Sequence, residues 1–235
     1  MFTQPRIAPS ILSADFMNME RDIRVIEEAG AGFVHVDVMD GHFVPNLTLG
    51  VPFVKQLARI TELPLDVHLM ISNPLEQLPW FLEHKPFMVT VHAEALDESA
   101  GEIDRAIDMI HEAGCKAGLA LKPDLSADAV APYIEKLDMV LVMSVYPGFS
   151  GQKYIEGSQD KVARVVEIAR TAGVAPLIQV DGGLGANDAT RAVCAAGADV
   201  LVAGSAVFGA EDRAQAVHAM IETACAAQAS ARKDA

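Results

Sequence analysis

Short apolar segments alternate with longer segments in which apolar residues recur every three or four positions. The short segments, rich in Val, Ile, Leu and Met, predict buried strands, and the longer ones predict amphipathic helices. Near-continuous apolar strands that alternate with helices are typical of a parallel sheet covered by helices. The expected strands are 7–12, 33–40, 65–71, 88–94, 116–122, 139–146, 177–182 and 200–204.

Glycines mark the ends of the predicted helices. The segments NMERDIRVIEEAG and SAGEIDRAIDMIHEAG end at Gly30 and Gly114, and similar endings occur at Gly173 and Gly197. Glycine commonly follows the last turn of a helix. Eight strand and helix units in 235 residues predict the α/β class and a single (β/α)8 TIM barrel, with a doubly wound open sheet as the alternative. We expect one domain over residues 1–228 and a frayed tail over 229–235.

Composition narrows the location and the partners. The chain is 51% hydrophobic, but no apolar run approaches the roughly 18 residues of a membrane span. The start MFTQPRIAPSIL lacks the pattern of a secretory signal, which predicts a cytoplasmic protein. Cys115, Cys194 and Cys225 are odd in number and widely spaced, as expected of buried thiols. The net charge of −14 argues against nucleic-acid binding, which depends on many Lys and Arg contacts to phosphate.

Four polar residues interrupt the apolar strands. They are His35 and Asp37 in FVHVDVMD, His68 in LDVHLM, and Asp181 in IQVDGG. A buried carboxylate must pair, bind metal or lose its charge, so one shared divalent cation explains all four positions. A single His in an apolar strand is more often a hydrogen-bonded core residue. Two His and two Asp together favour zinc, manganese, cobalt or ferrous iron over calcium.

The predicted fold brings these ligands together. His35 and Asp37 are two residues apart and therefore share one face of their strand. His68 shares a face with Met70, and Gln179 shares one with Asp181. In (β/α)8 barrels the catalytic groups lie at the carboxyl ends of the strands. We therefore expect the ligands to converge from the second, third and seventh strands.

Glycine-rich loops predict a second part of the site. The loops are YPGFSGQKY after the sixth strand, DGG at 181–183 and AGS at 203–205. In such barrels the loops after strands seven and eight commonly bind phosphate through backbone N–H groups. Each loop taken alone is also compatible with an ordinary turn. A small phosphorylated metabolite fits this pattern, whereas a nucleoside triphosphate does not, because the chain has no Walker A sequence.

Several segments, in order, resemble the ribulose-phosphate 3-epimerase family: APSILSADF, HVDVMDGHFVPNLTLG, DVHLM, VYPGFSGQ, VDGG and VAGSAVF. The similarity runs from about residue 6 to residue 209, and DVMDGHFVPN is its most specific segment. The resemblance implies a metal-dependent barrel of the ribulose-phosphate-binding type, which interconverts D-ribulose 5-phosphate and D-xylulose 5-phosphate. It also implies a homo-oligomer with one divalent metal ion per subunit, zinc first, with iron, manganese or cobalt as alternatives.

The resemblance assigns roles to individual residues. It implies that His35, Asp37, His68 and Asp181 hold the metal, and that Asp37 and Asp181 also transfer protons at C3 through an enediolate. Ser10, His68 and Asp181 would contact the substrate. The residues that would shield the intermediate are Met39, Met70 and Met143, although Met is usually a gap-filling core residue. The residues that would bind the phosphate are Gly148, Phe149, Ser150, Gly151, Gly182, Gly183, Gly204 and Ser205.

The chain departs from the family pattern in two places. Lys122 stands in ALKP, where members generally have Asn, and Tyr146 and Ser150 stand in YPGFSGQ, where members usually have NPGFGGQ. Lys122 either adds a charge toward the substrate or points outward, and Tyr146 would reshape the sugar pocket. The alternatives are therefore a 3-epimerase of another ketose phosphate such as allulose 6-phosphate, and a noncatalytic phosphosugar-binding protein with a decayed site.

Overall fold

Eight parallel strands form one closed sheet in this computed structural model, which describes residues 4–234, with side chains through residue 231. The strands are β1 (Arg6–Pro9), β2 (Val34–Met39), β3 (Leu65–Met70), β4 (Met88–His92), β5 (Lys116–Leu121), β6 (Met139–Met143), β7 (Leu177–Asp181) and β8 (Val200–Ala203). From β2 to β8 each strand pairs with the next one in the chain, and β8 pairs with β1. A parallel bridge between Ser10 and His35 joins β1 to β2 and closes the ring. This closure confirms the (β/α)8 barrel and excludes the open doubly wound sheet.

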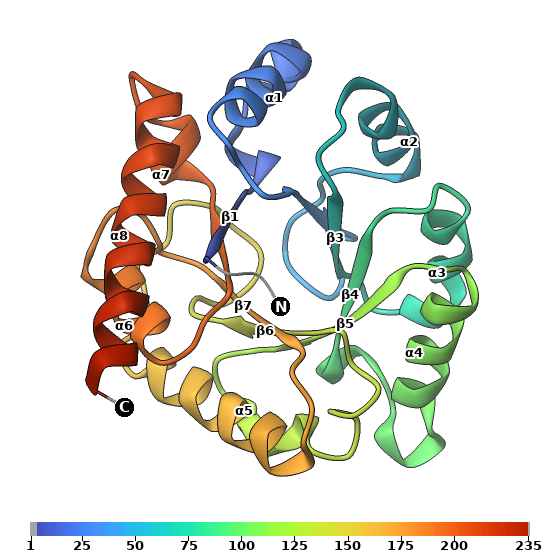
Figure 1. Ribbon diagram of the computed structural model, residues 1–235. Coiled ribbons are helices and arrows are strands. Elements are labelled where there is room, and N and C mark those ends of the chain that lie inside the picture. The colour runs from blue at the N-terminus through green and yellow to red at the C-terminus, as the bar shows by residue number, and fades with distance from the viewer. Residues whose placement is uncertain (1–3, 235) are drawn as a thin grey trace.

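Helices surround the sheet (Figure 1). The α-helices are α1 (Met19–Glu28), α2 (Val51–Ile60), α3 (Pro74–Leu82), α4 (Glu102–Glu112), α5 (Ser158–Ala172), α6 (Asp188–Ala195), α7 (Ser205–Phe208) and α8 (Arg213–Asp234). The short 3-10 helices are η1 (Ile11–Ser13), η2 (Phe16–Asn18), η3 (Ala93–Ala95), η4 (Glu98–Ala100) and η5 (Ala127–Val130). Within the described chain, η5 is the only helix between β5 and β6. None of the described helices is long and apolar enough to cross a membrane.

Two strands end earlier than their apolar pattern predicts. The first, expected over 7–12, ends at Pro9, because the Ser10 hydroxyl accepts the Leu12 N–H and caps η1. The sixth, expected over 139–146, ends at Met143, and the Ser144 carbonyl then accepts the Ile155 N–H from the following loop. Helix α8 continues through the segment 229–234, while Ala235 lies outside the described residues, so the frayed tail stays a prediction.

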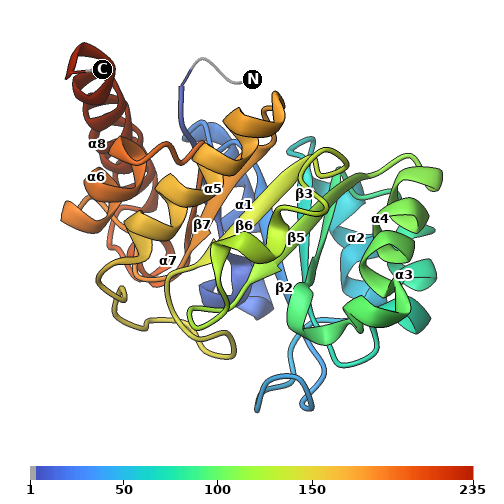
Figure 2. The ribbon, with the colours of Figure 1, turned by 90° about the horizontal axis from the view of Figure 1, so that it is seen from below.

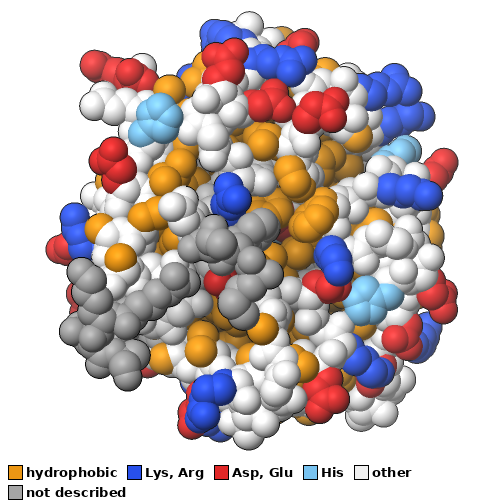
Figure 3. All heavy atoms as spheres, in the orientation of Figure 1, with side chains coloured by type: hydrophobic (Ala, Val, Ile, Leu, Met, Phe, Trp, Pro, Cys, Tyr) orange, Lys and Arg blue, Asp and Glu red, His pale blue; other side chains and the backbone are white. Residues whose placement is uncertain are grey.

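The predicted helix ends are confirmed. Gly30, Gly114, Gly173 and Gly197 follow α1, α4, α5 and α6, and all four have positive φ. Figure 2 shows that the two termini lie at one end of the barrel and the long β2–α2 loop lies at the other. Figure 3 shows the end of the barrel at which β1 begins, where hydrophobic side chains are visible between charged side chains of both signs.

The main hydrophobic core lies between the strands and the helices, whereas the inside of the barrel is partly polar. His35, Asp66, Thr90 and Gln179 are all buried there. Gly118 on β5 pairs in register with Thr90 on β4. A Cβ at Gly118 would lie 2.2 Å from Thr90 Oγ1, so the interior has no room for a methyl group at this position.

We expect Gly118→Ala to lower the free energy of unfolding by about 1–3 kcal/mol, because the added methyl group overpacks the barrel interior. Gly50→Ala is a matched control: a Cβ there meets only Pro52 Cδ, at 3.8 Å. Urea unfolding of the three proteins measures the difference. Equal midpoints for both variants would contradict the tight packing against Thr90.

Candidate metal centre

The four predicted metal ligands meet at the carboxyl end of the barrel. His35 Nε2 lies 3.3 Å from Asp37 Oδ1 and 3.9 Å from Asp181 Oδ2. His68 Nδ1 lies 3.2 Å and 3.8 Å from the same two oxygens. All four ligand atoms lie within 4.8 Å of one another. Ligand atoms around a tetrahedral zinc ion are roughly 3.3 Å apart, so a small displacement would let this set surround one ion.

Strand geometry explains why these residues converge. Asp37 on β2 is in register with His68 on β3, and the two-residue repeat turns His35 to the same face as Asp37. Asp181 ends β7, on another side of the ring. Both histidines are fully buried, and only the Asp181 side chain is appreciably exposed, at 16%.

A second layer of polar groups orients His35. Its Nδ1 lies 2.7 Å from Asp66 Oδ2, and Gln179 Nε2 donates to the same oxygen at 2.6 Å across the barrel. This carboxylate keeps a proton on Nδ1 and turns Nε2 toward the ligand cluster. His35 Nε2 is buried and has no hydrogen-bond partner among the described residues. A buried nitrogen left free beside two carboxylates fits a cation site.

The two aspartates have pKa values that move in opposite directions. Burial and the charge of Asp37 raise the pKa of Asp181 to about 6. Burial also acts to raise the pKa of Asp37, but the charge of His35, 3.3 Å away, and the neighbouring His68 hold this pKa well below its usual range. Burial acts to lower the pKa of His35, and the charges of Asp66 and Asp37 outweigh it and raise this pKa well above the usual value. Without a metal ion, protons therefore supply the positive charge of the cluster.

The sequence pattern assigns no role to four residues behind the predicted ligands, which are Asp66, Gln179, His92 and Glu94, although it places Gln179 on the same face as Asp181. Asp66 and Gln179 stand two residues before His68 and Asp181, so the same alternation identifies them in retrospect. His92 ends β4, and its Nε2 lies 2.8 Å from His68 Nε2. Burial is the largest of the effects that lower the pKa of His92 to about 4.

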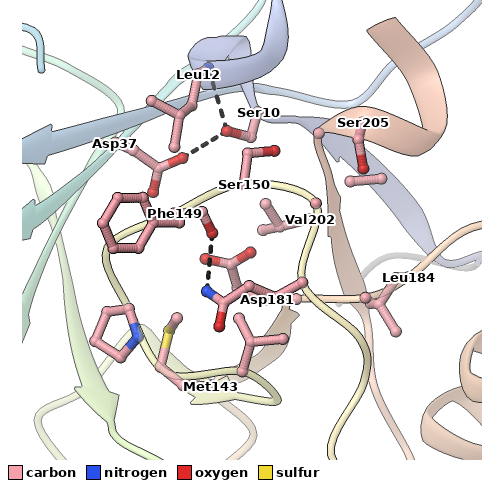
Figure 4. Close-up of a pocket in the computed structure, with 18 of the residues that line it drawn as sticks. Ser10, Leu12, Asp37, Met143, Phe149, Ser150, Asp181, Leu184, Val202 and Ser205 are labelled. Carbon is pink, nitrogen blue, oxygen red and sulfur yellow. Dashed lines mark hydrogen bonds between the residues drawn. The ribbon is translucent and has the colours of Figure 1, made fainter. Parts of the chain in front are cut away.

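A cavity of about 280 Å³ opens beside the aspartates. Figure 4 shows Ser10 next to Asp37, with Asp181 nearer to Met143. The cavity is lined by Ser10, Leu12, Asp37, Met39, Met70, Met143, 145–152, 181–184, Asn187 and 202–206. These residues include the three methionines and every residue predicted to bind phosphate. His35 and His68 are not among the lining residues of the described chain, because both rings are fully buried.

Hydroxyl groups at the cavity already have partners. Ser10 Oγ, predicted to contact the substrate, donates to Asp37 Oδ2 at 2.5 Å. Ser150 Oγ lies 2.5 Å from Ser13 Oγ, which links the loops after β6 and β1. Gly183 has φ +69, and a Cβ there would lie 2.3 Å from the Tyr154 backbone nitrogen, so this loop requires glycine.

The departures from the family pattern have different surroundings. The Lys122 Nζ lies 3.7 Å from the centre of the Phe43 ring, and Lys122 does not line the cavity described above. Tyr146 lines the cavity mouth and is 53% exposed. Gln152 donates to the Tyr146 and Phe149 carbonyls and so holds the turn of this loop.

Comparisons with known proteins agree with this geometry. The model of the family described as Ribulose-phosphate 3 epimerase family matches residues 6–208. The chain is 44% identical to "Ribulose-5-phosphate-3-epimerase, chloroplastic" of Arabidopsis thaliana, over 90% of this chain and 74% of that protein. It is also 44% identical to "Ribulose-phosphate 3-epimerase" of Bacillus subtilis, over 90% and 96% of the two chains. The structure of KGPDC from Streptococcus mutans in complex with D-R5P matches with a TM-score of 0.72 at 12% identity, over 94% and 97% of the two chains. That last likeness shows the fold alone.

We expect metal binding to release protons. Asp181, with a pKa of about 6, and His35, with a raised pKa, must lose their protons when their ligand atoms bind an ion. The apparent affinity of the metal-free protein for Co²⁺ should therefore fall as the pH drops from about 7 to about 5. Calorimetric titration in buffers of different ionisation enthalpy counts the released protons. A constant affinity without proton release would contradict the assignment of these ligands.

Proposed function

Because the chain belongs to the ribulose-phosphate 3-epimerase family, a family of isomerases, we propose that it interconverts D-ribulose 5-phosphate and D-xylulose 5-phosphate. One observation carries the proposal. Asp37 and Asp181 reach the same cavity from different strands, and their surroundings shift their pKa values in opposite directions. Paired carboxylates of this kind suit proton removal and proton delivery.

The proposal includes one divalent metal ion in each subunit. His35 Nε2, His68 Nδ1, Asp37 Oδ1 and Asp181 Oδ2 would hold it, and this mixed nitrogen and oxygen set suits zinc first, with iron, manganese or cobalt as alternatives. When bound, the ion would polarise the ketone and stabilise negative charge on the sugar, an effect worth several kcal/mol.

The two aspartates would exchange roles with the direction of the reaction. One carboxylate removes the C3 proton from one face of the sugar, and the other acid delivers a proton to the opposite face of the planar enediolate. Without an ion the pKa of Asp37 lies well below its usual range and that of Asp181 is raised to about 6, so the surroundings of the two acids differ. With one oxygen of each carboxylate on the ion, the second oxygen would handle the proton. Ser10 donates to Asp37 Oδ2 and so orients the second oxygen of this carboxylate.

The methionines would keep water away from the reacting carbon. Met39, Met70 and Met143 line the cavity, and each is at most 3% exposed. Their flexible thioether side chains tolerate a change in the shape of the sugar between tetrahedral and planar carbon. They contribute no proton and no charge, so the aspartates remain the acid and base groups at the cavity.

The glycine loops at the other side of the cavity would hold the phosphate. The net charge of −14 repels an anionic substrate at long range, so the phosphate must be held by local groups. The backbone of Gly182 and Gly183 after β7 and of Gly204 and Ser205 after β8 lines the cavity. Backbone N–H groups in such loops bind phosphate without needing a basic side chain.

The substrate is the part of the proposal most open to an alternative. Tyr146 and Ser150 replace smaller residues of the family pattern, line the cavity and would reshape the sugar pocket, so a 3-epimerase of another ketose phosphate such as allulose 6-phosphate is the first alternative. A noncatalytic phosphosugar-binding protein is the second alternative. The homo-oligomer and the cytoplasmic location remain predictions.

We expect the purified, metal-loaded protein to turn over ribulose 5-phosphate with a higher kcat/KM than allulose 6-phosphate. Side-by-side steady-state assays with both sugars measure this preference. A kcat/KM that is higher for allulose 6-phosphate would overturn the substrate assignment, and no turnover of either sugar would favour the binding protein.

Asp37→Asn and Asp181→Asn should each lower kcat for epimerisation by about 10²-fold to 10⁴-fold, as expected for loss of an acid or base group. Each variant keeps one carboxylate, so in heavy water each should still exchange the C3 hydrogen of one epimer and not of the other. Mass spectrometry of both recovered sugars, with the metal content measured in parallel, gives the result. Asp188→Asn, at a fully exposed side chain on α6, is the control. Exchange of both epimers by either active-site variant would contradict the two-base assignment.

A further inference from the structure

A line of hydrogen bonds leads from the metal ligand His68 to a carboxylate that the proposed reaction does not use. His68 Nε2, on the side of the ring away from the ligand cluster, lies 2.8 Å from His92 Nε2. His92 Nδ1 lies 3.2 Å from Glu94 Oε2. Both rings are fully buried, and the Glu94 side chain is 21% exposed. The line ends where Glu94 Oε1 accepts the Lys122 N–H at 2.7 Å.

We propose that Glu94 and His92 are positioning residues that hold His68 in the tautomer able to bind the metal ion. This inference rests on the metal site of the proposed function. It assigns no contact with the sugar to either residue. It concerns which nitrogen of His68 carries the hydrogen, a property that the four ligands do not determine by themselves.

The donors and acceptors along this line of hydrogen bonds lead to a single placement of the ring hydrogens of His92 and His68. An ionised carboxylate only accepts, so the hydrogen of His92 lies on Nδ1, facing Glu94. His92 Nε2 is then an acceptor, and the hydrogen between the two rings belongs to His68 Nε2. The lone pair of His68 therefore lies on Nδ1, the nitrogen that faces Asp37 and Asp181.

The opposite assignment would oppose metal binding. If His92 donated from Nε2, His68 would carry its hydrogen on Nδ1 and donate it to Asp37 Oδ1, 3.2 Å away. That hydrogen would occupy the lone pair that the ion needs. Without an ion, the assigned tautomer instead places a lone pair against a carboxylate, which is unfavourable. Glu94 thus favours the metal-bound protein at the expense of the metal-free one.

The two ligand histidines are oriented by the same kind of group at different distances. His35 contacts the Asp66 carboxylate directly, at 2.7 Å. His68 reaches the Glu94 carboxylate through a second imidazole, that of His92. Carboxylates behind ligand histidines commonly raise metal affinity because they fix the ring and its tautomer. The indirect arrangement makes the role of Glu94 separable from contact with the ligand itself.

Glu94→Gln is a sharp test, because the backbone determines how the amide is oriented. The Lys122 N–H needs an acceptor, so the amide oxygen takes the place of Oε1 and the amide NH₂ faces His92 Nδ1. A donor at that place reverses both tautomers. We expect the affinity of the metal-free protein for Co²⁺, measured against a competing chelator, to fall about 10-fold to 100-fold. Nitrogen-15 spectra of the histidine rings in the metal-free protein should show the His92 hydrogen moving from Nδ1 to Nε2.

Asp138→Asn is the matched control. Asp138 also holds a histidine, His111, at 2.8 Å and accepts a backbone N–H from Ala117 at 2.9 Å, but at the amino-terminal end of the strands. The Co²⁺ affinity of the Asp138→Asn protein should equal that of the wild type. The melting temperature of metal-free Glu94→Gln should not fall below that of the metal-free wild type, whereas a purely structural role of Glu94 would lower it.

A second pair of variants tests the middle of the line. In His92→Gln the side-chain oxygen can still accept from His68 Nε2, whereas His92→Phe leaves that N–H without a partner. Co²⁺ should therefore bind more tightly to His92→Gln than to His92→Phe.

Wild-type affinity in Glu94→Gln, or an unchanged His92 tautomer, would overturn the proposal. A wild-type protein that binds no divalent ion would overturn the metal centre instead, and the ring spectra would still decide whether Glu94 sets the tautomers.

Discussion

Two carboxylates and two imidazoles meet inside the barrel, and the described residues that line the adjoining cavity include no Lys or Arg, so the rest of the site depends on how this charge is balanced. Asp37 and Asp181 carry the negative charge, and His35 Nε2 has no hydrogen-bond partner in the described chain. Burial makes an uncompensated carboxylate costly. The charge can be balanced by a divalent ion or by protons, because without an ion the neighbouring carboxylates raise the pKa values of His35 and Asp181. In the proposed function, metal binding and proton transfer would therefore depend on one cluster.

The barrel can carry this cluster because its strands fix side chains more firmly than loops do. The two-residue repeat of β2, β3 and β7 produces two stacked polar layers: His35, Asp66 and Gln179 lie below Asp37, His68 and Asp181. The lower layer spans the barrel through the hydrogen bond from Gln179 to Asp66. An apolar interior would pack as well, but it would leave His35 free to rotate. The polar side chains of the lower layer bury less apolar surface than Leu or Val would, but they fix the orientation of the His35 ring.

Sequence alone predicts the eight strands and the convergence of His35, Asp37, His68 and Asp181, because isolated polar residues in apolar strands are conspicuous and strand ends converge in a barrel. It does not identify the contact between His92 and His68, which joins residues 24 positions apart through side chains on neighbouring strands. It also misplaces the end of β1, where one hydrogen bond from the Leu12 N–H to Ser10 overrides the apolar pattern. The position of Lys122 depends on the shape of the loop that carries Phe43, which no local pattern encodes.

The departures from the family pattern fall where they leave the cluster undisturbed. Glu94 is held by the backbone N–H of residue 122, so replacing Asn by Lys there changes the side chain and keeps the hydrogen bond. The lysine ammonium lies over Phe43, whose ring is 4.8 Å from that of His92, centre to centre. Tyr146 and Ser150 lie on the loop after β6, at the cavity mouth. Loops tolerate such changes because their backbone is not part of the sheet. Substrate choice can therefore vary in this barrel while the strands preserve the acids, the ligands and the groups that orient them.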